Sequence, residues 1–380
     1  MKKFLLCCAL ILPAAAQKWS IQYFYDELKT EMEITDLAFP TAERGIAVGA
    51  IYDKSSGRER YTSLATSDGG VHWALQPLKE YPRSIFFLND SLGWMVTDKG
   101  VWFTEESGRT WKKLCEQLKP DKNLDPPTTI GLLLRVWFLD EKHGFGVGLQ
   151  KTIVETKDGG RTWSPVAAAS KPAGNPAYTA YTHIVFADAK RGAIMGGSQP
   201  PRREDGFRAS LPAWADPERA SKRKQVPTLT LLAQTKDGGA TWEAATAPLF
   251  GQVTSLHFAG PDGLIVMGFN DSFEWPSEVD RLANQDTGRV FRDKTPRVID
   301  TGLYPGPHIY LAGVEPTGKM TTAAIPGKVK ILESDDFQTW TEMPVDYKAV
   351  ARSVVVAGPD KDHVWVSTDT GMILHLTGKP

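Results

Sequence analysis

Acidic residues recur along this chain at one fixed distance before a tryptophan, and such carboxylates could act as catalytic acids or as acceptors in turns. The repeated strings are TSDGGVHW (66–73), TEESGRTW (104–111), TKDGGRTW (156–163), TKDGGATW (235–242) and the degenerate ESDDFQTW (333–340). Catalytic carboxylates must converge on one substrate. Carboxylates that occur once per repeat on an outer rim cannot do so, and we therefore interpret them as structural.

The strings have the composition of a tight hairpin between two strands. Glycine supplies positive φ cheaply, the acid accepts hydrogen bonds from N–H groups of the turn, and the tryptophan begins the next strand and wedges between repeats. The residues assigned to this structural box are Asp68, Gly70, Trp73, Glu106, Trp111, Asp158, Gly160, Trp163, Asp237, Gly239, Trp242, Asp335 and Trp340.

Three arginines and a histidine form a second candidate group, because each begins the first strand of a repeat. They are Arg83, Arg135, His183 and Arg352. Together they could ring the mouth of a central channel and bind a carboxylate or phosphate of a partner. The alternative is that they satisfy backbone carbonyls or nearby acids. Arg83 and Arg352 stand one residue out of register with the other two, so their side chains could diverge.

The sequence gives weaker evidence for an enzyme than for a partner-binding protein. A glycosidase needs two carboxylates close together over the channel, and Asp36 is the one acid that the pattern places near its mouth. The histidines show no metal-ligand spacing, and we expect no metal and no cofactor. Cys115 lies just past a strand and reads as a half-buried thiol. We therefore favour a non-catalytic protein. The alternatives are a sialidase-like hydrolase and a glycan-binding lectin.

Two charged segments interrupt the repeats and are candidate partner-docking arms. Residues 199–227 contain Trp214 and the basic cluster RASKRK, and residues 270–295 contain Trp275 and an excess of acids. Both segments read as insertions on one rim, where they could bind a partner or pair with each other. The alternative is a disordered insertion.

A second repeated phrase precedes the box, and it supplies the strands. It is an apolar strand ending in an aromatic residue, a polar turn, a glycine and another apolar strand, as in RVWFLDEKHGFGVG and HIVFADAKRGAIMGG. Four antiparallel strands per unit predict an all-β β-propeller. We count seven blades, or six if 270–327 is one long insertion. KWSIQYFYDE (18–27) is expected to complete the last blade and close the ring.

The N-terminal segment and the overall composition narrow the possible locations and partners of the protein. MKKFLLCCALILPAAAQ has the layout of a secretory signal peptide cleaved near Ala16, so we expect residues 1–16 to be removed and 17–380 to form one exported domain, periplasmic or secreted. No other segment is apolar enough to cross a membrane. Forty-four basic against 45 acidic residues give no support for nucleic-acid binding. We expect a monomer.

On these motifs the chain resembles the BNR/Asp-box propellers, and within them the photosystem II stability/assembly factor type. The resemblance is carried by Phe138-Leu139-Asp140, Gly144 to Gly148 and the box from Thr156 to Trp163, and it extends over the whole mature chain. It implies a non-catalytic scaffold that holds a partner protein or peptide while a complex is assembled. The photosynthetic role itself does not carry over. The long loops between the repeats depart from the compact family pattern and would form the binding face.

Overall fold

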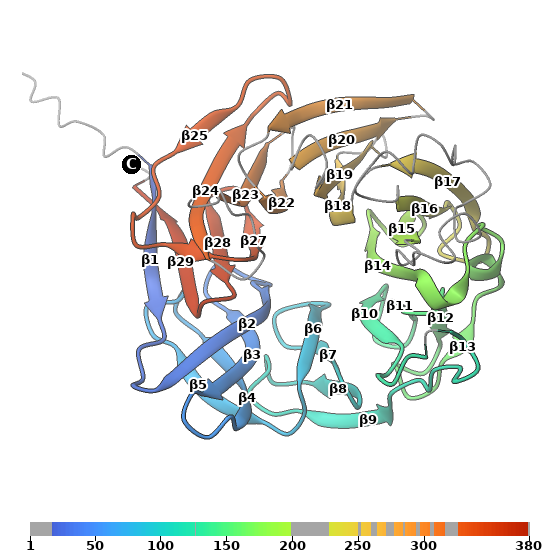
Figure 1. Ribbon diagram of the computed structural model, residues 1–380, viewed down its shortest axis with the longest axis horizontal. Coiled ribbons are helices and arrows are strands. Elements are labelled where there is room, and N and C mark those ends of the chain that lie inside the picture. The colour runs from blue at the N-terminus through green and yellow to red at the C-terminus, as the bar shows by residue number, and fades with distance from the viewer. Residues whose placement is uncertain are drawn as a thin grey trace, which may run out of the picture.

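The computed structural model is a ring of seven antiparallel sheets around a central channel (Figure 1). The structure describes residues 17–125, 127–198, 228–249, 252–259, 264–270, 277–283, 286–293, 297–304, 308–315 and 326–378. Each sheet is one blade, and its first strand lies nearest the channel. The all-β propeller predicted from the repeats is confirmed, with seven blades.

The first four blades follow the repeat, and in the fourth the segment 199–227, which lies outside the described residues, separates the second strand from the third. Their strands are β2 (Thr30–Ala38), β3 (Gly45–Asp53), β4 (Glu59–Thr66) and β5 (Ala74–Leu78); β6 (Pro82–Phe87), β7 (Gly93–Thr97), β8 (Gly100–Thr104) and β9 (Lys112–Glu116); β10 (Leu133–Phe138), β11 (Gly144–Gly148), β12 (Ile153–Thr156) and β13 (Ser164–Pro165); β14 (Thr179–Phe186), β15 (Gly192–Ser198), β16 (Thr228–Thr235) and β17 (Glu243–Leu249). Two 3-10 turns, η1 (Ala167–Ser170) and η2 (Pro176–Tyr178), connect blades 3 and 4.

The last three blades complete the predicted count of seven and include one whose two outer strands the sequence did not reveal. They comprise β18 (Gln252–Ala259), β19 (Leu264–Asn270), β20 (Ser277–Ala283) and β21 (Asp286–Asp293); β22 (Arg297–Leu303), β23 (Ile309–Glu315), β24 (Gly327–Ser334) and β25 (Thr341–Met343), with β26 (Val350–Ala351) beside β24; and β27 (Val354–Asp360), β28 (His363–Thr368), β29 (Met372–Thr377) and β1 (Lys18–Phe24). The reading of 270–295 as an insertion is wrong, because β20 and β21 are the two outer strands of blade 5.

The ring closes through β1, as predicted. This strand pairs antiparallel with β29, and Lys18 is the register partner of Thr377. Trp19 is 1% exposed and packs in one cluster with Leu374 and Leu376. The N-terminal strand is therefore the outermost strand of the last blade (Figure 1).

The inner strands share a backbone irregularity that shapes the channel. The register shifts once near the start of each inner strand in blades 1 to 6, for example between Leu133 and Arg135 and between Tyr181 and His183. Such bulges turn the following side chain in a new direction. Opposite the bulge, the second strand carries glycine in blades 1, 3 and 4, and a Cβ on Gly148, for example, would lie 1.8 Å from the Leu132 carbonyl oxygen.

The box tryptophans pack on the aromatic residues that end the inner strands. Trp163 lies 6.1 Å from Phe138 in the same blade, and Trp242 lies 5.6 Å from Phe145 of the preceding blade. Both contacts are edge-on, a geometry that aromatic rings favour. The box tryptophans thus fix the outer hairpin to its own blade and to the preceding one.

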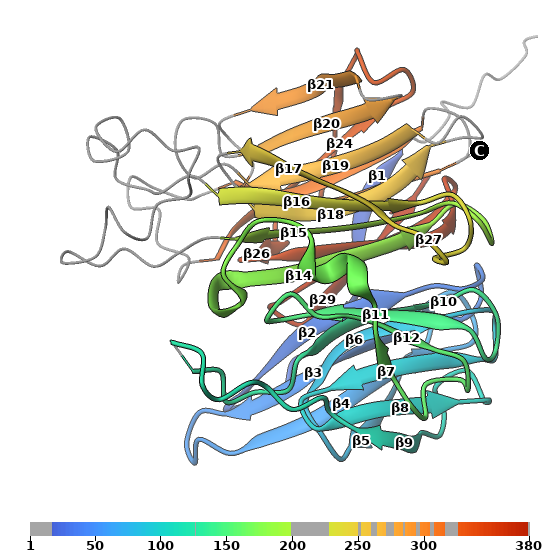
Figure 2. The same ribbon diagram turned by 90° about the vertical axis from the view of Figure 1, so that its right-hand side faces the viewer.

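The two faces of the ring differ in their connections. Box hairpins lie against the turn between the first two strands of the same blade, as the bond from Gly159 N–H to the Lys142 carbonyl shows. The other face, which we call the loop face, carries the connections between blades and between the second and third strands. The segments 53–58, 117–125 and 127–132 extend from it on the left of Figure 2. Among the described residues, no helix is long and apolar enough to span a bilayer.

Candidate functional site

The box carboxylates hold the turns of their own hairpins. Asp158 accepts hydrogen bonds from the Thr162 N–H at 2.9 Å and the Thr162 hydroxyl at 2.6 Å, while the Thr156 hydroxyl accepts the Gly160 N–H. Gly160 has φ 91°, which glycine tolerates. Asp68, Glu106 and Asp237 make the corresponding side-chain contacts in their own hairpins.

The fifth box is one residue shorter than the others, and the assignment of Asp335 to it is wrong. Asp336 accepts the N–H groups of Gln338 and Thr339, both at 2.7 Å, and Ser334 occupies the place of the box threonine. Alignment on Trp340 hid the deletion. Asp335 points elsewhere and contacts His308.

These hydrogen bonds favour the ionised form of each box acid. Contacts with Thr162 above all hold the pKa of Asp158 at about 2, and main-chain donation from His72 does the same for the pKa of Asp68. The pKa of Asp237 is lowered as well, chiefly by Thr241. A carboxylate stabilised in this way is a poor general acid at neutral pH.

A belt of polar contacts joins neighbouring inner strands around the channel. The Ser84 hydroxyl on β6 donates to the Leu134 carbonyl on β10 at 2.7 Å, and Ser255 on β18 bonds Thr301 on β22. Asp300 on β22 accepts the Val356 N–H of β27 at 2.7 Å. The bulges place these side chains where they tie one blade to the next.

Arg135 pairs with the buried carboxyl group of Asp36 in this belt and acts electrostatically on that of Asp300. Its guanidinium is 3.5 Å from Asp36, which is 3% exposed and also accepts the N–H groups of Leu37 and Ile85. Burial is the largest influence on Asp36 and raises its pKa, although Arg135 and the two amides oppose it. Burial likewise raises the pKa of Asp300 to about 7, and Arg135 and Asp36 both act on it electrostatically.

Two histidines complete the belt in neutral form. Burial lowers the pKa of His183 to about 3 and that of His257 to about 4, and the charge of Arg135 contributes at His183. His183 bonds the Thr254 carbonyl on the next inner strand at 3.0 Å. A neutral imidazole here links strands and does not add a positive charge to the channel.

The predicted ring of cations is therefore largely occupied by structural contacts. Arg83, at the bulge of β6, donates to the carbonyls of Gly131 and Leu133, and Arg352 pairs with Asp369 at 2.7 Å. Arg135 keeps 39% of its side chain exposed. Trp214 and Trp275 lie outside the described residues. The sequence reading missed Asp300 and His257, whose blades lack a clear first strand or box.

Long side chains hold the loop face between blades 2 and 4 in place. Gln117 donates to the Thr97 and Leu133 carbonyls and accepts the N–H groups of Leu118 and Leu133. The Lys151 ammonium donates to the carbonyls of Ser170 and Pro172, and its burial lowers its pKa. These loops are fixed by specific hydrogen bonds, which gives the face a defined shape.

Exposed apolar side chains gather on the connections between blades. Leu28 is 93% exposed, Tyr347 81%, and Phe24 and Ile130 51% each, and all four lie at or near blade-to-blade connections on the loop face. Single exposed apolar residues are ordinary. Among the described residues, however, only Val71 and Leu75 of the large exposed apolar side chains lie elsewhere.

A cavity of about 140 Å³ lies between blades 1 and 2, away from the channel. Glu80 lines it and already accepts hydrogen bonds from Thr97, Trp102 and Lys113. Hydrogen bonding with Lys113 helps lower the pKa of Glu80 against the opposing effect of burial. Glu80 is the one acid among the residues that line this cavity, and its carboxylate is already engaged in hydrogen bonds and an ion pair. The cavity therefore does not present the pair of carboxyl groups that a glycosidase needs.

Comparison with known proteins supports the same fold. The family model described as photosynthesis system II assembly factor YCF48 matches residues 115–199. A solved structure of YCF48 bound to D1 peptide is 17% identical over 96% of this chain and 98% of its own, with a TM-score of 0.57. YCF48 from Cyanidioschyzon merolae is 14% identical over 94% and 98%, with a TM-score of 0.55.

A third propeller comes from a different biochemical setting. The β-propeller domain of the trilobed protease from Pyrococcus furiosus is 10% identical over 92% of this chain and 94% of its own, with a TM-score of 0.50. No curated protein matches the sequence. The chain is thus a β-propeller that is similar to the photosystem II assembly factors, and at these identities the structural likeness establishes the fold alone.

Proposed function

We propose that this protein is a non-catalytic scaffold that binds a partner protein or peptide on its loop face. The observation that carries the proposal is the placement of Leu28, Ile130, Tyr347 and Phe24 on that face. Apolar and aromatic side chains exposed around a rigid framework are typical of protein-binding surfaces. The four-stranded blades supply the framework, and the hydrogen-bonded loops supply its shape.

Arg135 gives the same face a site for an acidic group. Its side chain is 39% exposed beside the channel, and a guanidinium suits a carboxylate of a bound peptide. The similar YCF48 structure has D1 peptide bound. By analogy, we infer that this chain binds a polypeptide segment with an acidic residue or a free C-terminal carboxylate, in the assembly of an envelope complex after export.

The alternative function is a glycan-acting hydrolase, and its support comes from the carboxyl groups of Asp36 and Asp300. Asp36 and Asp300 influence each other electrostatically, as two acids of a catalytic pair would. Each of them, however, accepts main-chain N–H groups from its own and the neighbouring inner strand. Such contacts are those of structural links between blades, so we favour the binding scaffold.

The test is affinity capture from the envelope fraction of the host with the mature chain as bait. Leu28→Glu combined with Tyr347→Glu is expected to lower capture of the specific partner at least tenfold, because both side chains would lose apolar contact. Val71→Glu, at an exposed site of the box face, is the matched control. Equal capture by all three baits would contradict the proposal, and turnover of an aryl-glycoside substrate would favour the hydrolase.

A further inference from the structure

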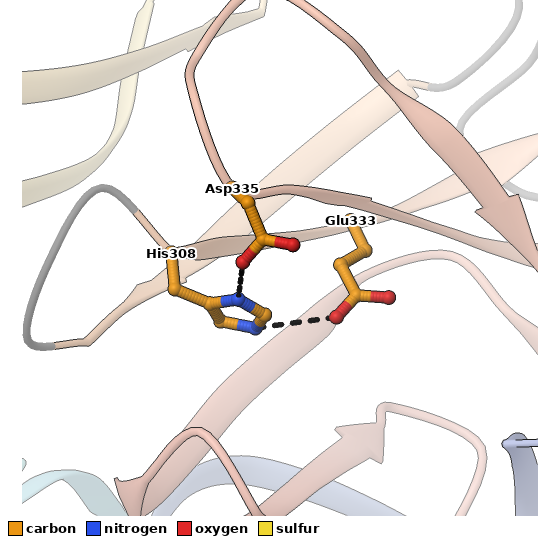
Figure 3. Close-up of side chains that lie close together, drawn as sticks. All are labelled: His308, Glu333 and Asp335. Carbon is orange, nitrogen blue, oxygen red and sulfur yellow. Dashed lines mark hydrogen bonds and ion pairs between the residues drawn. The ribbon is translucent and has the colours of Figure 1, made fainter.

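Blade 6 brings one histidine and two acids together on the box face (Figure 3). His308 precedes β23, Glu333 lies near the end of β24, and Asp335 begins the short hairpin after it. His308 Nδ1 is 2.5 Å from Asp335 Oδ1, and His308 Nε2 is 3.4 Å from Glu333 Oε1. The residues come from different strands, so their spacing in the sequence gives no ligand motif.

The Nε2 atom of His308 faces Glu333 at a distance too long for a hydrogen bond. The His308 side chain is 7% exposed, and Nε2 is buried without a hydrogen bond. A neutral ring that donates Nδ1–H to Asp335 directs the lone pair of Nε2 at a carboxylate oxygen. Two acceptors that face each other need a cation between them.

The distance between His308 Nε2 and Glu333 Oε1 is compatible with a bridging metal ion. A proton shared between imidazole and carboxylate gives a separation of about 2.7–2.9 Å. Zinc bonds of about 2.0–2.2 Å to nitrogen and oxygen place two ligand atoms of a tetrahedron about 3.3–3.6 Å apart. The observed 3.4 Å has the second value.

Blade 3 contains an internal comparison. His143 and Glu155 occupy the same two positions there, and their Nε2 and Oε1 atoms are 2.8 Å apart. The residue after the box threonine is Lys157, which contacts Glu155 at 3.4 Å. Blade 6 has Asp335 at that place, and Asp336 takes the box role two residues after Ser334.

We propose that His308 Nε2 and Glu333 bind a zinc ion, and that Asp335 holds the ring in the ligating tautomer. A carboxylate on the far nitrogen of a metal-bound histidine is a common second partner that fixes the ring. His308 is further held edge-on by Tyr310, at 4.7 Å between ring centroids. The remaining coordination positions would be taken by water or by a group of a partner on the box face.

The test is calorimetric titration of the chelator-treated full chain with Zn²⁺, with the absorption spectrum of bound Co²⁺ as a report of tetrahedral geometry. Wild type is expected to bind one ion. Glu333→Gln and Asp335→Lys are each expected to weaken binding at least tenfold. Asp335 is 80% exposed, so its replacement leaves the core intact.

Glu155→Gln is the matched control, because it removes the corresponding acid of blade 3, and it is expected to leave zinc affinity unchanged. Failure of wild type to bind Zn²⁺ at millimolar concentration would overturn the proposal, as would equal losses in Glu155→Gln and Glu333→Gln.

Discussion

At Asp300, burial and hydrogen bonding shift the pKa of the carboxyl group in opposite directions. Desolvation dominates and raises its pKa to about 7, while the N–H groups of Val356 and Thr301 favour the charge. A group whose pKa is higher in the folded state than in the unfolded state adds stability below the unfolded value. That contribution is lost as pH rises from about 4 through about 7.

Asp300→Asn is therefore expected to flatten the pH dependence of stability. The difference in unfolding free energy between wild type and variant should shift toward the variant by roughly 1–4 kcal/mol between pH 4 and pH 8. Urea unfolding at several pH values measures it. Exposed Asp90→Asn serves as the control, and a constant difference for Asp300→Asn would show that its carboxyl group does not titrate in this range.

Residue-level predictions from sequence succeeded where a contact is local and failed where it crosses blades. The acid of a box and its donors lie within a few residues, so the pattern in TKDGGRTW indicates the turn directly. Arg83 instead uses carbonyls of β10, and His183 uses one of β18. Those partners depend on the bulges and on the neighbouring strand, neither of which has a sequence signature.

The box hairpin is the element that repeats most faithfully, and its acid has several hydrogen bonds to lose. Asp158→Ala is expected to lower the Tm by about 2–4 °C, because the turn loses its acceptor for the Thr162 N–H and hydroxyl. Calorimetry at pH 7 measures the shift. Lys157→Ala, at an exposed neighbour, is expected to change the Tm much less.

The Tm difference between wild type and Asp158→Ala is expected to depend on pH. The pKa of Asp158 is about 2, below its usual value, so its stabilising effect is complete above about pH 4 and is lost as pH falls toward 2. The Tm difference between wild type and Asp158→Ala should shrink over that window. A difference that persists unchanged at pH 2 would mean that the ionised form of the carboxylate is not what holds the turn.

At the level of elements, the sequence predicted the blades that keep both repeated phrases. Blade 5 has no box between β20 and β21, and this is why 270–295 was read as an insertion. The fifth box was misaligned because its hairpin lost one residue while Trp340 stayed. A repeat is recognised through its invariant turn residues, so a blade without them is found only by its pairing.

At the scale of the whole molecule, closure of the ring depends on strand β1. The Trp19 ring is buried, lies 5.6 Å from Tyr310, and directs its indole nitrogen at the Met343 sulfur, 3.3 Å away. Trp19→Ala is expected to destabilise the fold by about 3–5 kcal/mol. Loss of β1 would also expose the edge of β29 to intermolecular pairing, with association visible by size-exclusion chromatography.

Phe24→Ala is the matched control for this prediction, because Phe24 lies on the same strand and is 51% exposed. It is expected to cost well under 1 kcal/mol and to leave the elution volume unchanged. Equal destabilisation by the two variants would argue against closure through the Trp19 core.

The pairing of β1 with β29 also sets an order of events during synthesis. A ribosome makes β1 before any blade is finished, and its partner emerges after every other strand. Until then Trp19 has no apolar cluster to enter, and six blades stand beside an incomplete seventh. Translation must therefore pass β29 (Met372–Thr377) before the circle becomes a single cooperative body, which makes truncation before this strand as damaging as loss of the first strand.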